Sequence, residues 1–359
     1  MSWTLYPASD FARHRQEWSQ LHAALDPPHA SALLATEFVE PLIGQFGRGD
    51  ELLACLREKD RLRAMAIVQQ GRRGAWNTFQ PAQAPIGLWL QQPDLDTAEA
   101  AHSLLGALPG FPLLLALTQM DPMLAPRPAN GPGIRTLDYI DTARVTLAGS
   151  FDDYWNARGK NLRANLKKQR ARLERDGVAT RMVVDREPAR MAQAVQDYGC
   201  LETSGWKGSK GTAVSSENAQ GRYYRVMLEG MAARGAASVY RYYFGEQLVA
   251  MDLCVEDGAS LVVLKTAYDE SVSPNLSPTL LMREEACRSL FDGGRFARLE
   301  FYGRVMEWHT RWTEEVRTLY HVNHYRWPAV GRLHALLEAR AKVAATAQSR
   351  PVHTTTTSP

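Results

Sequence analysis

ASLVVLKTAYDESVSPNLSPTLLMREEACRSLFDGG, residues 259–294, is the stretch that decides the fold of this chain. Leu261–Ala267 is a short apolar run rich in β-branched residues, which predicts a strand. Tyr268–Ser277 is polar and contains a proline, which predicts a loop. Pro278–Asp292 carries apolar residues at helical spacing and predicts a helix with one buried face.

The predicted helix has signals at both ends. Ser277 suits the N-cap, and Pro278 suits the first helical position because the N–H that proline lacks has no intrahelical partner there. Gly293 is expected to end the helix. The buried face is expected to consist of Met282, Ala286, Cys287, Leu290 and Phe291.

Arg295–Phe301 predicts a further strand, so this region runs strand, helix, strand. That order implies a right-handed crossover and a parallel pair of strands. Ligands of such units tend to lie beyond the carboxyl ends of the strands, where free N–H groups of the helix start can hold a phosphate or pyrophosphate. An ordinary connection without a ligand explains the same residues, and no glycine-rich phosphate loop of the Walker or dinucleotide kind is present here.

The composition is that of a soluble globular protein large enough for two domains. The chain has 359 residues, of which 45% are hydrophobic and 23% are charged. Its net charge of +3 is too small to indicate a nucleic-acid-binding protein by itself. Four widely spaced cysteines fit a reducing cytoplasm, and each is expected to be a small core residue: Cys55, Cys200, Cys254 and Cys287.

Nothing in the sequence predicts export or membrane insertion. The N-terminal residues MSWTLYPASDFARHR lack the apolar run of a signal peptide. The most apolar stretch, Leu104–Leu117, is interrupted by Pro109, Gly110 and Pro112 and is too short to span a bilayer. A cytoplasmic location is therefore expected. The residues after about Ala341 have little to bury and predict a disordered tail.

The first half of the chain predicts a mixture of helices and strands. The expected elements are a helix from Ser9 or Asp10 to about Leu25, strands at Leu52–Arg57 and Leu62–Gln70, a helix at Thr97–Leu108 and a strand at Phe111–Thr118. Asp121–Arg135 holds four prolines and two glycines and predicts a linker. Tyr139–Leu147 then predicts the strand that opens the second half.

Ser150–Gly177 predicts one long helix, with Ser150 and Asp153 forming a capping box and Gly177 at the C-cap. Eight cations share this helix: Arg158, Lys160, Arg163, Lys167, Lys168, Arg170, Arg172 and Arg175. A solvated face explains them. Because like charges repel, an anionic partner is the alternative, whether cofactor phosphates, RNA or anionic lipid.

The rest of the second half predicts a loop, a helix and an antiparallel meander. The loop includes GCLETSGWKGSKG, residues 199–211, and the helix is Arg222–Arg234. The meander strands are expected at Ala237–Phe244, Gln247–Val255 and Leu261–Ala267. LRAMAI, residues 62–67, resembles LVAMDL, residues 248–253, and both open the second strand of a hairpin. This short internal similarity indicates that the two halves share an architecture.

Four pieces of the second half carry a family resemblance when they are taken in order. They are SFDDYWNARGKNLRANLKKQRARLERDG (150–177), LETSGWKGSKGTA (201–213), LKTAYDESVSPNLSPTLLMREEA (264–286) and LEFYG (299–303). Together they resemble the acetyltransferase domain of the CelD-like group, within the GNAT superfamily and close to the FemABX-type tandem proteins. The resemblance implies an α/β fold with a mixed sheet and two tandem GNAT-like lobes. Its parts are a degenerate lobe at 1–120, a linker at 121–138, an acyltransferase domain at 139–330, and a helix end with a tail at 331–359.

The resemblance also implies an activity, namely transfer of an acyl group from acetyl-CoA or another acyl-CoA to an amine without a metal. An amino sugar or a polysaccharide precursor is the implied acceptor. Backbone groups of the fourth GNAT strand bind the pantetheine arm, which implies Leu264 and Thr266 here. The following loop and helix start hold the pyrophosphate, which implies Asn275, Ser277 and Thr279. The family's usual glycine-containing loop is replaced by SVSPNLSPT, so the identity of the acyl donor stays open.

Such a reaction needs a base for the ammonium proton, N–H donors for the oxyanion and an acid for the leaving thiolate. Asp269 and Glu300 are the candidate bases, and Tyr268 or Tyr302 is the candidate acid. Surface carboxylates and core tyrosines explain the same residues. The candidates for substrate binding are Trp206, Lys207, Lys265 and Tyr302.

GRVMEWHTRW, residues 303–312, stands where the family usually has an acidic, a tyrosine and a lysine position. The changed positions are Arg304, Trp308 and His309, which predicts a different substrate specificity. His309 is a further candidate base, although a lone histidine is more often structural. His321 and His324 lack a third ligand and do not predict a metal site.

Two other functions are compatible with the sequence. A FemABX-like aminoacyl-tRNA-dependent transferase would use the basic helix, but the small net charge argues against a large RNA footprint. A non-catalytic GNAT scaffold in exopolysaccharide assembly would explain the changed segment after residue 303. The expected partner is a small-molecule or glycan-precursor acceptor, with tRNA as the alternative and no DNA.

Overall fold

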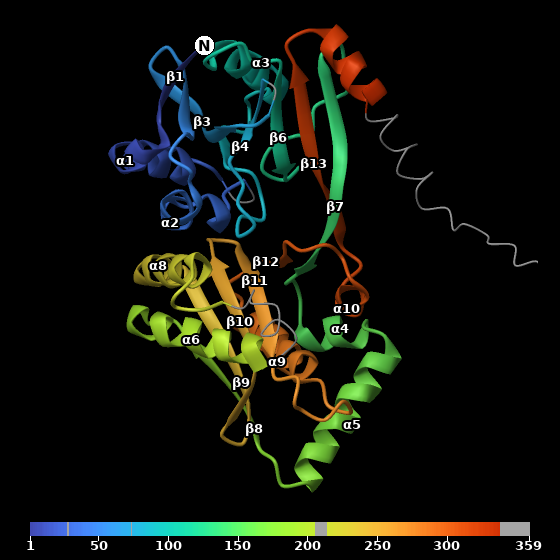
Figure 1. Ribbon diagram of the computed structural model, residues 1–359. Coiled ribbons are helices and arrows are strands. Elements are labelled where there is room, and N and C mark those ends of the chain that lie inside the picture. The colour runs from blue at the N-terminus through green and yellow to red at the C-terminus, as the bar shows by residue number, and fades with distance from the viewer. Residues whose placement is uncertain (27–28, 73, 205–213, 338–359) are drawn as a thin grey trace, which may run out of the picture.

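The computed structural model describes residues 1–26, 29–72, 74–204 and 214–337. Its strands form one 13-stranded mixed sheet that runs through two lobes (Figure 1). The order of neighbouring strands is β1-β2-β3-β4-β6-β13-β7-β12-β11-β10-β9-β8, and β5 pairs with β3 beside this path.

The first lobe contains strands β1 to β6 and helices α1 to α3. Their bounds are β1 Ser2–Pro7, η1 Ala8–Asp10, α1 Phe11–Ala23, η2 Ala32–Leu34, α2 Thr36–Phe46, β2 Leu52–Glu58, β3 Arg61–Gln70, β4 Ala75–Thr78, β5 Trp89–Gln91, α3 Thr97–Ala107 and β6 Leu114–Met120. The helices and strands predicted for this half are all present, and β1, α2, β4 and β5 are additional.

The second lobe contains strands β8 to β12 and helices α4 to α10. Their bounds are α4 Phe151–Asn156, α5 Lys160–Arg175, β8 Thr180–Asp185, α6 Pro188–Ser204, α8 Ala219–Ala233, β9 Ala237–Phe244, β10 Gln247–Glu256, β11 Ser260–Tyr268, α9 Pro278–Gly293, β12 Arg298–Phe301 and α10 Glu307–Thr310. The predicted meander is β9-β10-β11, and the predicted parallel pair is β11 with β12.

Both lobes share one order of elements: a strand, two helices, three strands, a helix and a strand, and the first lobe has β5 as an additional strand between β4 and α3. In each lobe the last two strands of that order are parallel, β4 with β6 and β11 with β12, whereas the other neighbours are antiparallel. The echo between residues 62–67 and 248–253 falls on β3 and β10, which occupy equivalent places in the two lobes. The short sequence similarity therefore reflects a shared architecture.

Two long strands, β7 (Ile134–Thr146) and β13 (Val316–Tyr325), join the lobes. They pair with each other, while β7 also pairs with β12 of the second lobe and β13 with β6 of the first. The strand expected at Tyr139–Leu147 is β7, and it begins earlier, at Ile134. The prediction missed this start because the early residues are held by β13, which lies far away in the sequence.

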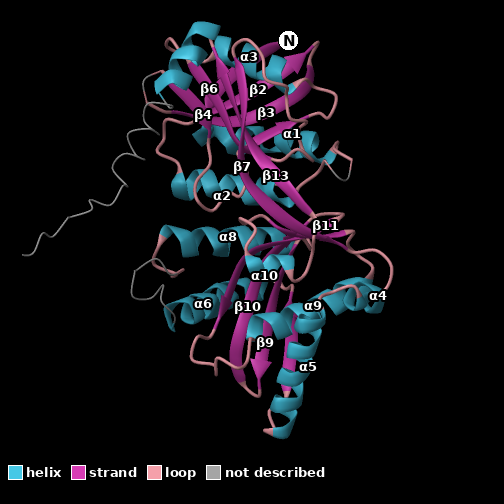
Figure 2. Cartoon of the chain, turned by 90° about the vertical axis from the view of Figure 1, so that its right-hand side faces the viewer, coloured by secondary structure: helices cyan, strands magenta, loops and turns pink. Residues whose placement is uncertain are grey.

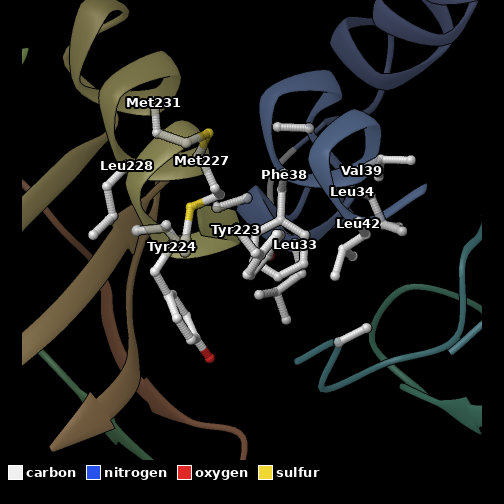
Figure 3. Close-up of a cluster of buried hydrophobic side chains, with 14 of the residues drawn as sticks. Leu33, Leu34, Phe38, Val39, Leu42, Tyr223, Tyr224, Met227, Leu228 and Met231 are labelled. Carbon is white, nitrogen blue, oxygen red and sulfur yellow. The ribbon is translucent and has the colours of Figure 1, made fainter. Parts of the chain in front are cut away.

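An apolar cluster fixes the lobes against each other (Figure 3). Helix α2 of the first lobe faces α8 of the second in both views (Figures 1 and 2). The Tyr223 ring lies edge-on to Phe38 and Phe46, with ring centroids 5.9 and 5.6 Å apart. Because this contact is extensive and hydrophobic, the lobes are expected to keep one relative orientation.

The predicted single helix at Ser150–Gly177 is wrong, because two helices, α4 and α5, occupy this stretch. Gly159 separates them with an extended backbone at φ −53° and ψ 134° and is the N-cap of α5. The predicted end signals hold: the Ser150 hydroxyl accepts the Asp153 N–H, and Gly177 has a positive φ of 68°. Glycine is disfavoured within a helix by roughly 0.5–1 kcal/mol relative to alanine, which is consistent with a break at this position.

Several smaller predictions are settled by the structure. The predicted face of α9 is buried, but the left-handed residue after this helix is Gly294, not Gly293. Three cysteines are buried as expected, whereas Cys200 is exposed on α6. The predicted tail after Ala341 lies outside the described residues. Within the described part of the chain, no helix combines the length and hydropathy that a membrane span requires.

Candidate functional site

Strands β11 and β12 separate part of the way along their length. They pair only between residues 260–262 and residues 298–300. Strand β11 then continues to Tyr268, paired on its other edge with β10. Within the described residues no strand covers the remaining edge of 263–268. Its N–H and C=O groups are therefore available to a ligand that lies along the strand.

One pocket lies between this end of β11 and the start of α9, and we call it the α9 pocket. It has a volume of about 1040 Å³ and is lined by the end of β11, the loop that follows, the first turns of α9 and the α10 segment. Trp308, Trp312, Leu276 and Leu280 give it apolar walls. A pocket of this size and character suits a long, flexible and partly apolar ligand.

Five of the predicted site residues meet in the α9 pocket: Thr266, Tyr268, Asp269, Ser277 and Thr279. Partial burial alone would raise the pKa of Asp269. Hydrogen bonds from Ser271 and Gln247 outweigh that effect and lower the pKa below its usual value, so the carboxylate is ionised at neutral pH.

The start of α9 offers fewer backbone donors than expected. The Ser277 N–H donates to Oε1 of Gln169 on α5, at 2.7 Å, and Pro278 has no N–H. The Leu280 N–H donates to the Ser277 carbonyl oxygen. Ser277 is the N-cap by position, but its side chain makes no capping hydrogen bond. The Thr279 N–H is thus the one donor of this first turn without a partner in the described residues.

A buried ion pair forms part of the wall of the α9 pocket. Arg283 of α9 lies 2.7 Å from Oδ2 of Asp252 on β10, and the Thr266 hydroxyl donates to Oδ1 of the same carboxylate at 2.5 Å. The sequence analysis missed this pair. The available signal was a lone aspartate within the apolar run AMDLCV, because a buried carboxylate needs a partner.

A second pocket, the α5 pocket, lies next to the α9 pocket at the start of α9. It has a volume of about 710 Å³ and contains the predicted residue Asn275. Ser277 borders both pockets. Cationic side chains of α5 form its other wall.

A third pocket, the interlobe pocket, lies on the other side of the β11 edge. It has a volume of about 520 Å³ and is lined by residues 80–85 of the first lobe together with the predicted residues Leu264, Lys265 and Tyr302. Its charged lining consists of two cations, Lys265 and Arg304. The Lys265 ammonium lies 3.4 Å from a Glu202 oxygen.

Tyr302 and Glu300 belong to a buried polar network. The Tyr302 hydroxyl donates to Asp121 at 2.8 Å, and Arg317 bridges Asp121 and Glu300 at 2.8 and 2.7 Å. Burial raises the pKa of Glu300, although Arg317 opposes the change. Glu300 lines neither the α9 nor the interlobe pocket, so the structure does not bring it together with Asp269.

The remaining residues considered in the sequence are three histidines and two residues of the 199–211 loop. His309 is buried, its Nδ1 accepts the Met306 N–H, and burial lowers its pKa to about 4. His321 accepts the Gln119 N–H, whereas His324 contacts His102, so the two histidines do not converge on one ligand. Trp206 and Lys207 lie outside the described residues.

A family model and several solved structures are similar to this chain. Residues 160–310 match the family model described as an acetyltransferase (GNAT) domain. This span runs from α5 to α10 and includes β11 and α9. The match supports the prediction that the chain is an acyltransferase enzyme. No curated protein matches the chain.

Three solved structures show the same fold over nearly the whole chain. FemX has a TM-score of 0.56 at 9% identity and covers 90% of this chain and 98% of its own. The C-terminal domain of a putative lysylphosphatidylglycerol synthetase from Agrobacterium fabrum has a TM-score of 0.53 at 14% identity, with 92% and 96% covered. A conserved protein of unknown function from Bacteroides thetaiotaomicron has a TM-score of 0.51 at 8% identity, with 87% and 97% covered.

At these identities the likeness concerns the fold alone. Together with the repeated order of elements and the domain match, it confirms the predicted α/β GNAT-like fold with a mixed sheet and two tandem lobes.

Proposed function

We propose that this protein is an N-acyltransferase that moves an acetyl or longer acyl group from acyl-CoA to the amine of an amino sugar or polysaccharide precursor. One observation carries the proposal. The edge of residues 263–268, which no strand of the described residues covers, separates the α9 pocket from the interlobe pocket. A thioester that enters from the α9 side and an amine that enters from the interlobe side would meet at that edge.

The chemistry assigned to this edge is a simple exchange of bonds. A C–N bond forms between the amine and the acyl carbon, the thioester C–S bond breaks, and the amine gives up a proton while the leaving thiolate takes one. The backbone of Leu264 and Thr266 would hold the pantetheine arm by strand-like hydrogen bonds. Holding both reactants in one geometry supplies much of the rate enhancement in such a transfer.

For the proton transfers we propose Asp269 as the acceptor and Tyr268 as the donor. Both lie at the end of β11 and line the α9 pocket, and Tyr268 is 47% exposed. Asp269 is ionised at neutral pH, as a proton acceptor must be. Glu300 stays the alternative base. Its substitution would also remove a partner of Arg317, so a loss of activity there needs a stability measurement beside it.

The character of the interlobe pocket supports a hydroxyl-rich acceptor that carries negative charge. Tyrosines and glutamines line it together with Lys265 and Arg304, and none of the described residues of its lining is a carboxylate. Such groups suit hydrogen bonding to sugar hydroxyls and pairing with a carboxylate or phosphate. Trp206 and Lys207 stay predicted contributors to this site.

We further propose that the first lobe is degenerate and takes no acyl donor. Gly87 fills the place equivalent to the open edge of β11, because its N–H donates to the Thr118 carbonyl oxygen of β6 at 3.2 Å. The Thr78 and Thr118 hydroxyls meet at 2.7 Å between β4 and β6. The Asp96 carboxylate accepts the first free N–H groups of α3, which leaves no anion site there.

The test begins with calorimetric titration of acetyl-CoA and longer acyl-CoAs, followed by an acetylation assay over a panel of amino sugars. We expect Asp269→Asn to lower kcat/KM by about a hundredfold or more with donor affinity unchanged, the usual size of a general-base effect. Glu270→Gln is the matched control, since Glu270 lines the same pocket next along the chain. A folded protein that binds no acyl-CoA would contradict the proposal.

The basic helix α5 keeps an aminoacyl-tRNA donor as the second candidate. Aminoacyl-tRNA binding whose affinity falls steeply with salt, with no acyl-CoA binding, would favour it.

A further inference from the structure

The eight cations of residues 158–175 fall into groups that have different partners in the structure. Three are held by the protein itself. Arg170 pairs with Glu284 and Glu285 of α9 at 2.7 and 2.9 Å. Arg158 donates to the Trp312 carbonyl oxygen, and Arg163 donates to that of Arg158. These contacts attach α5 to the rest of the second lobe and leave those cations little freedom to bind a ligand.

Three other cations face the α5 pocket: Lys168, Arg172 and Arg175. They are spaced four and then three residues apart, so they lie on one face of the helix. Arg311, beyond α10, joins them from the other side. Asp176 is the one carboxylate of the lining, 3.6 Å from Arg172 and 3.5 Å from Arg175. Arg311 is paired with Glu307 at 2.8 Å, so the three α5 cations against the Asp176 carboxylate give this lining its net positive charge, which attracts anions.

The α5 pocket adjoins the α9 pocket. The two share Pro274, Leu276, Ser277, Leu280 and Arg311. Both views place α5 beside α9 (Figures 1 and 2), and the bond from Ser277 to buried Gln169 joins the helices at this point. A ligand that lies along β11 and passes the start of α9 therefore reaches the α5 cations.

The hydrogen bond from Ser277 to Gln169 explains why side-chain cations are needed to bind a diphosphate at the start of α9. Because Gln169 takes the Ser277 N–H and Pro278 has none, the first turn of α9 keeps a single backbone donor, that of Thr279, without a partner among the described residues. A helix start of this kind holds a diphosphate poorly by itself. Side-chain cations on α5 supply the missing attraction.

We propose that the α5 pocket binds the phosphates of the 3′-phosphorylated ADP end of acyl-CoA, with Lys168, Arg172 and Arg175 as the residues that select a phosphorylated donor. This inference rests on the proposed acyl-CoA function. Helix α5 precedes the repeated order of elements, so donor recognition is assigned to a part of the second lobe that has no counterpart in the first.

The experiment is calorimetric titration of the full chain with acetyl-CoA, acetyl-dephospho-CoA, which lacks the 3′-phosphate, and acetyl-pantetheine, which lacks the nucleotide. Lys168→Gln and the double variant Arg172→Gln/Arg175→Gln are compared with Lys167→Gln. Lys167 is the matched control because it is the adjacent, exposed lysine and does not line the pocket.

We expect acetyl-CoA to bind at least about tenfold more weakly to the double variant, as loss of charge-assisted phosphate contacts predicts. The affinity for acetyl-pantetheine is expected to be unchanged in every variant. Lys167→Gln is expected to alter the acetyl-CoA affinity by less than about twofold, the usual size of a surface charge effect. Circular dichroism and thermal melts of each variant verify that it is folded.

The outcomes separate the inference from the function on which it rests. Equal affinities for acetyl-CoA and acetyl-pantetheine, unaffected by the α5 variants, would overturn the inference and leave the acyltransferase proposal in place. Failure of the folded wild type to bind any of the three thioesters would overturn both. Binding of tRNA alone through the same three cations would also overturn the inference.

Discussion

Asp252 and Arg283 form the most deeply buried ion pair next to the candidate site, at 1% and 5% side-chain exposure. We expect Asp252→Ala to lower the free energy of unfolding by about 3–5 kcal/mol, because the Arg283 guanidinium would stay buried without a counter-charge. The Thr266 hydroxyl would lose its acceptor as well. Urea denaturation at pH 7 measures the effect.

The control for this prediction is Asp152→Ala. Asp152 pairs with Arg288 at 3.4 Å, but the two side chains are 76% and 50% exposed. Such a surface pair contributes less than about 1 kcal/mol. Equal losses of stability in the two variants would contradict the importance assigned to the buried pair.

His309 gives the protein a pH-dependent term in its stability. Burial lowers its pKa in the folded state to about 4 from the ordinary 6.5, so the folded protein favours the neutral ring. The unfolded chain takes up the proton first as the pH falls. The contribution of the neutral His309 ring to the free energy of unfolding is therefore fully present above pH 6.5. It is lost as the pH falls from 6.5 to 4, and the free energy of unfolding then decreases by up to about 1.4 kcal/mol per pH unit.

The measurement is the difference in unfolding free energy between wild type and His309→Asn across pH 7.5 to 4.5. Carboxylates titrate in both proteins, so the difference isolates this one ring. We expect the wild type to lose more stability than the variant as the solution is acidified. Parallel curves for the two proteins would show that the His309 pKa is not lowered on folding.

At the scale of elements, the gap between the two parallel strands differs between the lobes. In the first lobe it lies between β4 and β6, and in the second between β11 and β12. In the second lobe the edge of β11 is open, whereas in the first lobe residues near Gly87 fill the gap between β4 and β6. A Cβ at Gly87 would lie 2.3 Å from the Thr118 carbonyl oxygen and 2.7 Å from the Thr78 hydroxyl. Only glycine fits at this position.

We expect Gly87→Ala to destabilise the protein by about 1–3 kcal/mol or more, since the atoms in its way include backbone and must move. Gly106→Ala is the matched control. It lies in α3 with no atom within 4 Å of the added Cβ, and alanine is favoured over glycine within helices by roughly 0.5–1 kcal/mol. The melting temperatures of the two variants should therefore shift in opposite directions from that of the wild type. An unchanged melting temperature for Gly87→Ala would mean that the gap between β4 and β6 is not tightly filled.

At the scale of the whole molecule, one sheet carries two copies of an order of elements, and within the described residues the gap between the parallel strands is left uncovered in the second lobe alone. If the second lobe alone binds acyl-CoA, calorimetry should give one donor per chain. Asp96→Ala, which frees N–H groups at the start of α3, should leave that number unchanged because Gly87 still fills the gap. A stoichiometry of two in the wild type would contradict the degenerate first lobe.

The sequence by itself determined most of the elements and their kind. Periodicity and end signals act over a few neighbouring residues, so β11, the following loop and α9 were predicted closely. The structure places four residues that were named through the family resemblance, Tyr268, Asp269, Ser277 and Thr279, beside one pocket. The family resemblance supplied the GNAT-like fold and the acyl-CoA reaction, which no local pattern contains.

Only the tertiary structure decided how distant residues combine. Pairing of β7 with β13, the partition of the α5 cations into structural and pocket-facing groups, and the separation of Glu300 from Asp269 all depend on partners remote in sequence. The capture of the Ser277 N–H by Gln169 is a contact of the same kind. Local signals cannot reveal them, because the free energy of a buried charge or an unpaired edge is set by what the rest of the chain packs against it.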